Sequence, residues 1–152
     1  MSEGYSAIEA VYKEDHDRLW RALLGYCGQP DVATEAVAET FAQAIGRGSA
    51  LHSPRDWIWR SAFRIARGML GERRDEPITP EAEQGLPEPV VDVVRALATL
   101  PEKQRLCVVL HDYADRPVIE VAGLLGIAAP TVYVHLGRGR RRLRELLGGP
   151  DE

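Results

Sequence analysis

The chain has 152 residues, and 19 basic against 23 acidic residues give it a formal net charge of −4 at pH 7. This length can bury the cores of one or two small domains, while 14 glycines and 10 prolines predict several breaks in regular structure. The negative net charge argues against a protein that coats nucleic acid with its whole surface, so any contact with DNA must come from local basic patches.

The sequence carries no sign of a membrane segment or a secretion signal. No apolar run approaches the length of a membrane span, and the first ten residues lack a basic start followed by a hydrophobic core. Cys27 and Cys107 stand alone, without a neighbouring cysteine or a histidine pair. We therefore expect a cytoplasmic protein with no membrane partner, and two buried thiols rather than a disulfide or a metal site.

Two helices are predicted at the start of the chain. The first covers about residues 6–26, where apolar residues recur at helical spacing and the other side is charged. The residues 28–31, GQPD, end this helix, and Asp31 is placed to cap the second helix, over about 32–46.

A third helix follows the glycine-containing loop 46–53, GRGSALHS. Ser53 is placed to cap it, Pro54 fits its first turn, and it is expected to run to about Arg74. The helix interleaves two kinds of side chain, which are Trp57, Trp59 and Phe63 and the arginines Arg60, Arg64 and Arg67. In one interpretation the aromatic rings are core and the arginines extend over them into water. In the other, the two kinds together form a surface that stacks on nucleic acid.

Composition changes abruptly after Arg74. The segment 75–89, DEPITPEAEQGLPEP, contains four prolines and several acidic residues but few large apolar ones. Because it can bury little apolar surface, it is predicted to be a flexible linker between one domain over 1–74 and another over 90–152. The second domain begins with a helix over 90–100, and Pro101 opens the next helix.

The segment 117–147 predicts a helix-turn-helix. Gly126 can adopt the left-handed conformation that ends the first helix, and Pro130 fits the first turn of the second. The apolar positions Val132, Leu136, Leu143 and Leu147 fall on one face of the second helix. Five arginines against one glutamate in this helix would suit a phosphate backbone. Helical hairpins also occur in purely structural bundles, and arginine-rich faces are often only solvated, so both interpretations stay open at this point.

No strand pattern of useful length is present. We therefore expect an all-α fold of two small helical domains joined by a flexible linker, with a helix-turn-helix in the C-terminal domain. The four histidines are scattered, and no nucleophile–base pair, metal cluster or phosphate loop is recognisable. The expected mode of action is binding rather than catalysis, without a cofactor or a metal.

Four stretches, in order, resemble the extracytoplasmic-function (ECF) group of bacterial RNA polymerase sigma factors in the sigma-70 family. Ala33–Ile45 is similar to the family's acidic helix that contacts the polymerase clamp, and Ser53–Arg74 to the helix that melts and reads the −10 promoter element. Ala96–Tyr113, with its L-P-x-x-Q-R, is similar to the opening of the family's C-terminal domain. Glu120–Leu146, with E-V-A, L-G and T-V at the family's spacing, is similar to the reader of the −35 element.

The resemblance implies a transcription initiation factor that binds core RNA polymerase and directs it to promoter DNA, with an anti-sigma factor as a further potential partner. The implied polymerase contacts are Glu35, Glu39, Thr40 and Gln43. The implied −10 contacts are His52, Ser53, Trp57, Arg60, Arg64 and Arg67, and a flipped base would enter a pocket near the 46–53 loop. The implied −35 contacts are Thr131, Tyr133, Val134, His135, Arg138, Arg141 and Arg142.

The recognition helix departs from the family pattern. Tyr133, Val134 and His135 stand where family members usually carry basic and small polar residues. This departure and the negative net charge leave open a sigma-like adaptor that binds polymerase or another protein without reading DNA. A free-standing helix-turn-helix regulator that works without polymerase is a third interpretation.

Overall fold

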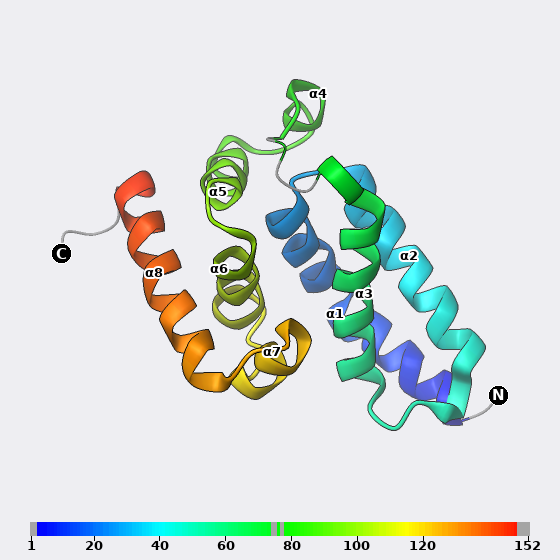
Figure 1. Cartoon of the computed structure of the whole chain (residues 1–152). Coiled ribbons are helices and arrows are strands. Elements are labelled where there is room, and N and C mark those ends of the chain that lie inside the picture. Colours follow the sequence, from blue (N-terminus) through cyan, green and yellow to red (C-terminus); the bar gives the residue numbers. More distant parts are fainter. Residues whose placement is uncertain (1–2, 74–75, 77, 149–152) are drawn as a thin grey trace. The chain divides into compact units, whose positions relative to one another are not determined.

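The computed structural model describes residues 3–73, 76 and 78–148, and every regular element in these ranges is a helix (Figure 1). The prediction of an all-α fold is therefore confirmed. The chain divides into two compact units, Met1–Arg74 and Asp75–Glu152. The domain limits that the sequence predicted at residues 1, 74, 75 and 152 lie outside the described residues.

The first unit is built from three long helices. They are α1 (Glu3–Cys27), α2 (Pro30–Arg47) and α3 (Pro54–Leu70), with the 3-10 turns η1 (Gly48–Ala50) and η2 (Gly71–Arg73) after α2 and α3. Helix α1 begins three residues earlier than predicted. Helix α3 ends at Leu70, because Gly71 turns the chain with a positive φ of 53°. The predicted end at Arg74 lies outside the described residues.

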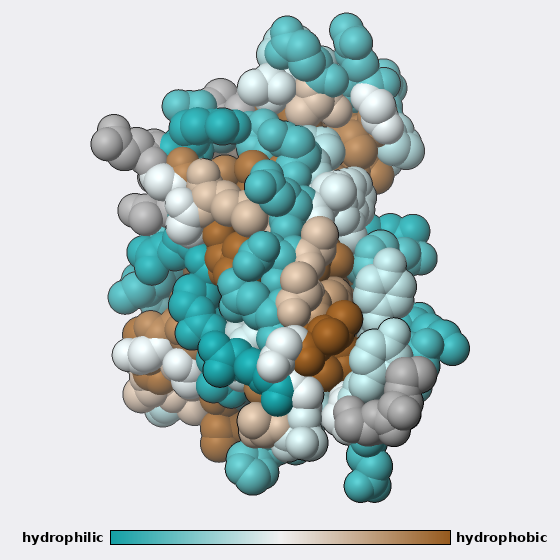
Figure 2. Space-filling model, turned by 90° about the vertical axis from the view of Figure 1, so that its right-hand side faces the viewer, coloured by the Kyte–Doolittle hydropathy of each residue, from teal (hydrophilic) through white to brown (hydrophobic). Residues whose placement is uncertain are grey.

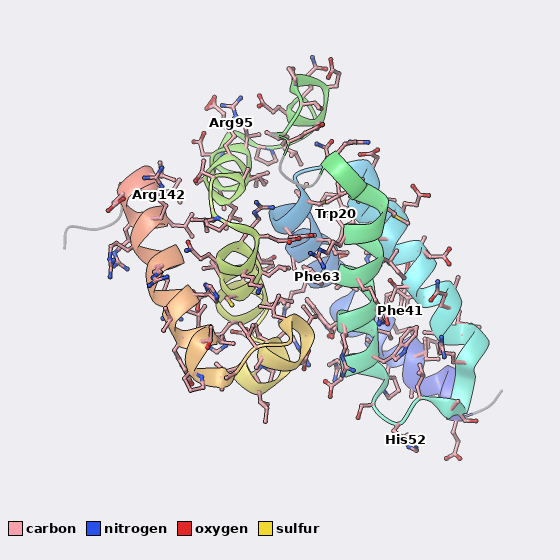
Figure 3. All side chains as sticks on the ribbon, in the orientation of Figure 1. Trp20, Phe41, His52, Phe63, Arg95 and Arg142 are labelled. Carbon is pink, nitrogen blue, oxygen red and sulfur yellow. The ribbon has the colours of Figure 1, made fainter. Side chains whose placement is uncertain are left out.

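Small residues let α2 pack closely against its two neighbours. Ala33, Ala36 and Ala44 are fully buried on one face of α2. Opposite them, the large apolar side chains of α1 and α3, among them Leu19, Leu23 and Ile58, are also fully buried. In Figure 3 the labelled rings of Phe41 and Phe63 lie among these three helices.

The structure separates the aromatic residues of α3 into two groups. Trp59 and Phe63 are buried, with stacked rings whose centroids are 6.3 Å apart, and Tyr26 packs on Phe63 at 5.8 Å. Trp57, by contrast, is only partly buried, and the Arg47 guanidinium lies 5.2 Å above its ring. The core interpretation is therefore correct for Trp59 and Phe63, and only Trp57 remains available to a ligand.

The second unit contains four helical segments and one short additional helix. They are α4 (Pro80–Glu83), α5 (Glu88–Ala98), α6 (Glu102–Cys107) with its continuation η3 (Val108–Tyr113), α7 (Val118–Leu125) and α8 (Ala129–Leu147). Fully buried side chains form the core, among them Leu100 from the turn between α5 and α6, Leu110 of η3, Val121 of α7 and Leu136 of α8.

The predicted linker contains more regular structure than its composition suggested. Thr79 accepts a hydrogen bond from the Ala82 amide at 3.1 Å and so caps α4. Helix α5 begins at Glu88 instead of residue 90, because Pro89 fits the first turn of a helix, where no backbone N–H is needed. Arg95 of α5 forms an ion pair with Glu83 of α4.

The continuation of α6 is a π-helix, which the sequence did not indicate. The wider turn shows in the hydrogen bonds from the Ala114 amide to the Val109 carbonyl at 3.0 Å and from the Arg116 amide to the Leu110 carbonyl at 2.8 Å. Asp115 then takes a positive φ of 57°, and His111 Nδ1 lies 2.8 Å from the Arg116 carbonyl oxygen.

Across the described ranges, no single helix is long and apolar enough to cross a membrane. Helices α7 and α8 reach the required length and composition only as a pair, and they are bent by 97° relative to each other.

Candidate nucleic-acid interface

The turn between α7 and α8 has helix-turn-helix geometry. Gly126 is left-handed (φ 68°, ψ 34°), and the Ile127 amide donates to the Ala122 carbonyl at 3.1 Å, which closes the end of α7. Pro130 lies in the first turn of α8, as the sequence predicted. The 97° bend between the helices falls within the range of DNA-binding helix-turn-helix motifs.

The inner face of α8 is held closely against α6 and η3. Val132 and Leu136 are fully buried on this face. Gly139 is also buried, and a Cβ placed there would lie 2.8 Å from Val108 Cγ2 and 3.6 Å from the Gln104 carbonyl oxygen. Only glycine therefore allows this approach. The predicted inner position Leu147 is different, because its side chain is 43% exposed near the end of the helix.

An ion pair fixes the middle of α8. Arg140 donates from Nε to Asp112 Oδ2 at 2.7 Å and from Nη2 to Oδ1 at 2.5 Å, so that the guanidinium and the carboxylate of η3 meet at two points. The hydrogen bond raises the pKa of Arg140 above its ordinary value. Arg140 of α8 is therefore paired with a residue of another element, η3, in its own unit.

Most of the predicted −35 contacts lie on the outer face of α8. Thr131, Tyr133, Val134, Arg138, Arg141 and Arg142 are exposed. Tyr133 and Val134 expose 61% and 48% of their surface, so they present apolar groups to any partner of this face. Arg142 lies 3.7 Å from Glu145 in an exposed pair.

His135 does not share this exposure. Its side chain is partly buried, and its Nδ1 is enclosed without a hydrogen-bond partner among the described residues. The expectation that His135 presents its ring to DNA on the flank of the helix therefore needs correction, because one of its two ring nitrogens, Nδ1, is enclosed.

The predicted −10 residues form a second exposed surface on the first unit. His52 projects from the loop before α3 in Figure 3, and Ser53 next to it is also exposed. Ser53 occupies the N-cap position, but its side chain accepts no cap hydrogen bond from the residues that the structure describes. Arg60, Arg64 and Arg67 are exposed at spacings of four and three, on one side of α3. Arg64 also donates to Ser61 Oγ at 2.9 Å.

The predicted polymerase contacts are divided between surface and core. Glu35 and Glu39 are exposed on α2, and Gln43 donates to Glu39 at 2.8 Å. Thr40 is fully buried and its hydroxyl donates to the Ala36 carbonyl at 2.7 Å. In this conformation Thr40 has no surface to offer a partner, and its role is to pack α2.

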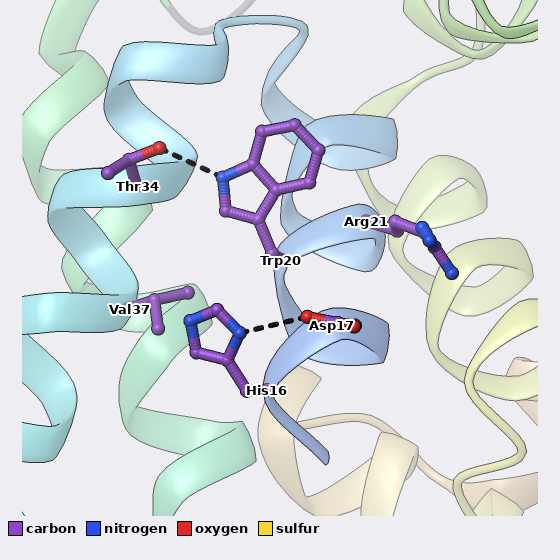
Figure 4. A pocket seen from close by; sticks show the side chains of 6 residues that line it. All are labelled: His16, Asp17, Trp20, Arg21, Thr34 and Val37. Carbon is purple, nitrogen blue, oxygen red and sulfur yellow. Dashed lines mark hydrogen bonds and ion pairs between the residues drawn. The ribbon is translucent and has the colours of Figure 1, made fainter. Parts of the chain in front are cut away.

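A shallow pocket of about 330 Å³ opens between α1 and α2 (Figure 4). Trp20 of α1 donates from its indole to Thr34 Oγ1 at 2.9 Å, and His16 Nδ1 lies 3.1 Å from Asp17 Oδ1. From α2 the pocket is lined by Thr34 and Val37, and the predicted polymerase contacts Glu35 and Glu39 do not line it.

Three residues that matter to these surfaces were missed at the level of sequence. Asp15 is 7% exposed and binds α3, although it stands in a charged run, KEDHDR, that looks solvated. Arg105 is 2% exposed and donates to the Leu97 and Leu100 carbonyls at 3.0 and 2.9 Å. Its place before the apolar run LCVVL could have signalled burial, whereas nothing in the sequence identified Asp112 as the partner of Arg140.

Both cysteines are buried thiols, as predicted. Burial raises the pKa of Cys107 to about 11, so the thiol stays protonated at neutral pH.

Comparison with known proteins gives a consistent result. Residues 91–143 match the family model of sigma-70, region 4. The chain is 28% identical over 153 residues to the ECF RNA polymerase sigma factor SigM of Mycobacterium tuberculosis, which covers 93% of this chain and 78% of that protein.

Two solved structures share the fold of nearly the whole chain. One is CnrH in complex with the cytosolic domain of CnrY, with a TM-score of 0.75 at 21% identity over 98% of this chain and 92% of the other. The second is the sigma factor RpoE in complex with the anti-sigma factor NepR from Bartonella quintana, with a TM-score of 0.73 at 18% identity over 94% and 99%. Residues 91–143 thus resemble region 4 of the sigma-70 family, and the chain is similar to an ECF sigma factor over most of its length. The two solved structures, at 21% and 18% identity, show a shared fold.

Proposed function

We propose that the three surfaces divide the work of promoter recognition as the family motifs imply. The observation that carries this proposal is the two-sided construction of α8. Its inner face packs within its own domain through Val132, Gly139 and the Arg140–Asp112 pair. Its outer face remains exposed. A helix held in this way can enter the major groove without disturbing its own domain.

In the proposed −35 contact, the outer face of α8 combines two kinds of readout. Arg138 and Arg141 carry planar donor groups that suit guanine edges or phosphates. Val134 offers an exposed apolar group, which suits the methyl group of thymine. The mixture favours a helix that contacts base edges over one that binds only the phosphate backbone.

In the proposed −10 contact, the loop after α2 and the exposed side of α3 receive the unpaired strand. His52 and Ser53 lie in the loop, and Trp57 follows one turn later with part of its ring exposed. The stripe formed by Arg60, Arg64 and Arg67 would accompany the phosphates, while a base stacks on an exposed ring. Stacking would offset the cost of unpairing that base.

Core RNA polymerase would bind the acidic side of α2, through Glu35, Glu39 and Gln43. Bacterial polymerase and promoter DNA are in the cytoplasm, so a factor that binds both acts there. CnrH and RpoE are each described in complex with another protein, and we propose that an anti-sigma factor holds this chain too.

The surface of the chain is suited to such partners. Figure 2 shows hydrophobic patches among the hydrophilic side chains of one face. The large apolar side chains that are exposed include Tyr12 and Ile45 in the first unit and Ile119 and Leu146 in the second. Ile119, at 79% exposure, has the most to gain from being covered.

The test is transcription from a promoter library with randomised upstream sequence. Core polymerase with this chain is expected to start at sites that share −35 and −10 sequences, whereas core polymerase alone would show no such enrichment. A chain that co-purifies with polymerase but enriches no upstream sequence would be an adaptor. A chain that binds DNA specifically but does not co-purify with polymerase would be a free-standing regulator.

A further inference from the structure

The first turn of α1 lies directly against the loop that precedes α3. Gly4 is buried, and a Cβ at this position would lie 2.4 Å from the Ser49 amide nitrogen and 2.5 Å from the Gly48 carbonyl carbon. Both neighbours are backbone atoms, which cannot rotate away as a flexible side chain can. The backbone of η1 therefore keeps its position only while residue 4 has no side chain.

A second contact ties α1 to the first two turns of α3, directly after the same loop. Asp15 Oδ2 accepts a hydrogen bond from Arg55 Nε at 2.8 Å and another from Trp59 Nε1 at 2.8 Å. Arg55 also reaches the neighbouring Glu14 with its Nη2. Asp15 is 7% exposed, so these charge-assisted hydrogen bonds are largely shielded from water. They raise the pKa of Arg55.

The two contacts lie 11 residues apart on α1, which corresponds to about 16 Å along an ideal helix axis. Between them the chain runs through Leu51, which is partly buried, to His52 and Ser53, which are exposed. The chain is thus anchored to α1 at the start of the loop and just after its end in α3, and the exposed loop residues lie between the anchors.

We propose that α1 acts as a template that holds the 48–53 loop in the shape needed to receive the unpaired −10 strand, with Gly4 and Asp15 as its positioning residues. This inference rests on the proposed −10 function of the loop. Neither residue contacts DNA in this account. A loop ordered before binding loses less conformational entropy when it captures a base, so its affinity for single-stranded DNA depends on the template.

The test measures binding of the complete holoenzyme to a single-stranded oligonucleotide that carries the −10 sequence found by library transcription. We expect Gly4→Ala and Asp15→Asn each to weaken this binding by about tenfold or more, since small displacements of a binding group have effects of this size. Binding to core polymerase and to a duplex −35 element should change less than twofold, because α2 and α8 are untouched.

Three control variants distinguish an effect of where the residue lies from an effect of the substitution itself. Gly46→Ala makes the same change at a glycine for which no described atom lies within 4 Å of an added Cβ. Asp17→Asn removes the same charge from a carboxylate that is 82% exposed on the same helix. Ile58→Val loosens the core without touching the loop, and it calibrates how far lower stability alone affects binding. All three controls should bind the oligonucleotide like the unchanged protein.

A measurement on the unchanged chain keeps the proposal testable if Gly4→Ala does not fold. Backbone NMR order parameters of residues 48–53 should match those of the flanking helices, at about 0.85, and values below about 0.6 would overturn the template. Equal loss of oligonucleotide binding in Ile58→Val and Gly4→Ala would also overturn it.

If His52→Ala weakens oligonucleotide binding but Gly4→Ala and Asp15→Asn do not, the loop reads DNA without a template. If His52→Ala and the two template variants all leave binding unchanged, the −10 function of the loop itself is wrong.

Discussion

Gly137 and Gly139 are two residues apart in α8, but their surroundings are opposite. No described atom lies within 4 Å of a Cβ added at Gly137, whereas a Cβ at Gly139 would collide with Val108 and approach Gln104. From sequence alone both glycines carry the same helix penalty. In the structure, only Gly139 gains close packing in return.

Substitution by alanine should therefore change stability in opposite directions at the two sites. We expect Gly137→Ala to raise the free energy of unfolding by up to about 1 kcal/mol, because alanine favours the helix. Gly139→Ala should lower it by about 1–3 kcal/mol, since the branched Val108 cannot rotate freely out of the way. Urea unfolding followed by circular dichroism measures both, and equal changes at the two sites would contradict the packing described here.

Arg138 and Arg140 form a second informative pair. We expect Arg138→Ala to weaken binding to a duplex −35 element by about 1–3 kcal/mol if its guanidinium reads a base edge. Arg140→Ala should leave that affinity nearly unchanged and reduce stability by about 1 kcal/mol at most, because the Arg140–Asp112 pair is partly exposed. Fluorescence anisotropy with a labelled duplex compares the two. A larger loss of affinity in Arg140→Ala would show that the ion pair opens on DNA.

Tyr133 and His135 should respond differently to added charge. Tyr133 is 61% exposed, so Tyr133→Lys should add one phosphate contact and steepen the plot of log affinity against log salt by about 0.9. His135→Arg should steepen it less, because part of that side chain is enclosed. Titrations of non-specific duplex at several salt concentrations measure both slopes. An unchanged slope for Tyr133→Lys would indicate that this face contacts protein.

At the scale of the helix, Arg105 connects the end of α5 to α6. Its guanidinium donates to the carbonyl of Leu97, in the last turn of α5, and to that of Leu100, just after the helix. The arginine of the L-P-x-x-Q-R motif thus has a structural task in this chain, as a side-chain cap that fixes the angle between two helices.

Removing this cap should be costly. We expect Arg105→Met to lower the free energy of unfolding by about 2–4 kcal/mol, because two buried carbonyls each lose a charged donor. The control Arg95→Met removes an arginine that is 56% exposed and should cost less than about 1 kcal/mol. Thermal unfolding of the two variants side by side distinguishes them, and similar melting temperatures would contradict the capping role.

Several helix limits followed local signals in the sequence. The predicted cap Asp31 was wrong, because α2 begins at Pro30 and Asp31 lies inside its first turn. Pro54, Gly126 and Pro130 lie where the sequence predicted them, because their conformational limits act within one turn. The π-turn of η3 could not be predicted in this way, since it depends on packing between helices. The partners of Asp15 could not be predicted either. They lie 40 and 44 residues away, so no local pattern connects them.

The candidate site was predictable to the same extent. The exposed outer face of α8 followed from its 3.6-residue period, which assigns Val132 and Leu136 to the core. The helical period of α2 likewise assigns Thr40 to the inner face, although the family resemblance implies a polymerase contact there. The burial of His135 Nδ1 did not follow from the period, because this residue lies at the border of the apolar stripe. At such a border, the neighbouring helix decides which atoms reach water.

At the scale of the whole molecule, the chain contains two compact units. Each has its own core, centred on Leu23 and Ile58 in the first and on Leu110 and Leu136 in the second. The proline- and acid-rich segment that connects them can bury little apolar surface. We therefore expect the units to fold separately.

Limited proteolysis tests this expectation. Trypsin and a glutamate-specific protease should both cut first within residues 73–89 and release two fragments that stay helical by circular dichroism. The short helix α4 has only four residues and should protect its own bonds weakly. Cleavage that begins inside α1 or α8, or fragments that lose their helical signal on separation, would contradict independent folding.

The two faces of α8 have a consequence for how such proteins diversify. Stability resides in Val132, Leu136, Gly139 and Arg140, while Val134, Arg138 and Arg141 face outward. Mutations on the outward side can therefore accumulate with little effect on folding, so selection can retune promoter choice without first repairing the scaffold. Duplicated copies of one gene can drift apart in their target genes while they still compete for the same polymerase. In engineered regulators, the outward residues of α8 can be exchanged between relatives to change which promoter sequence is read.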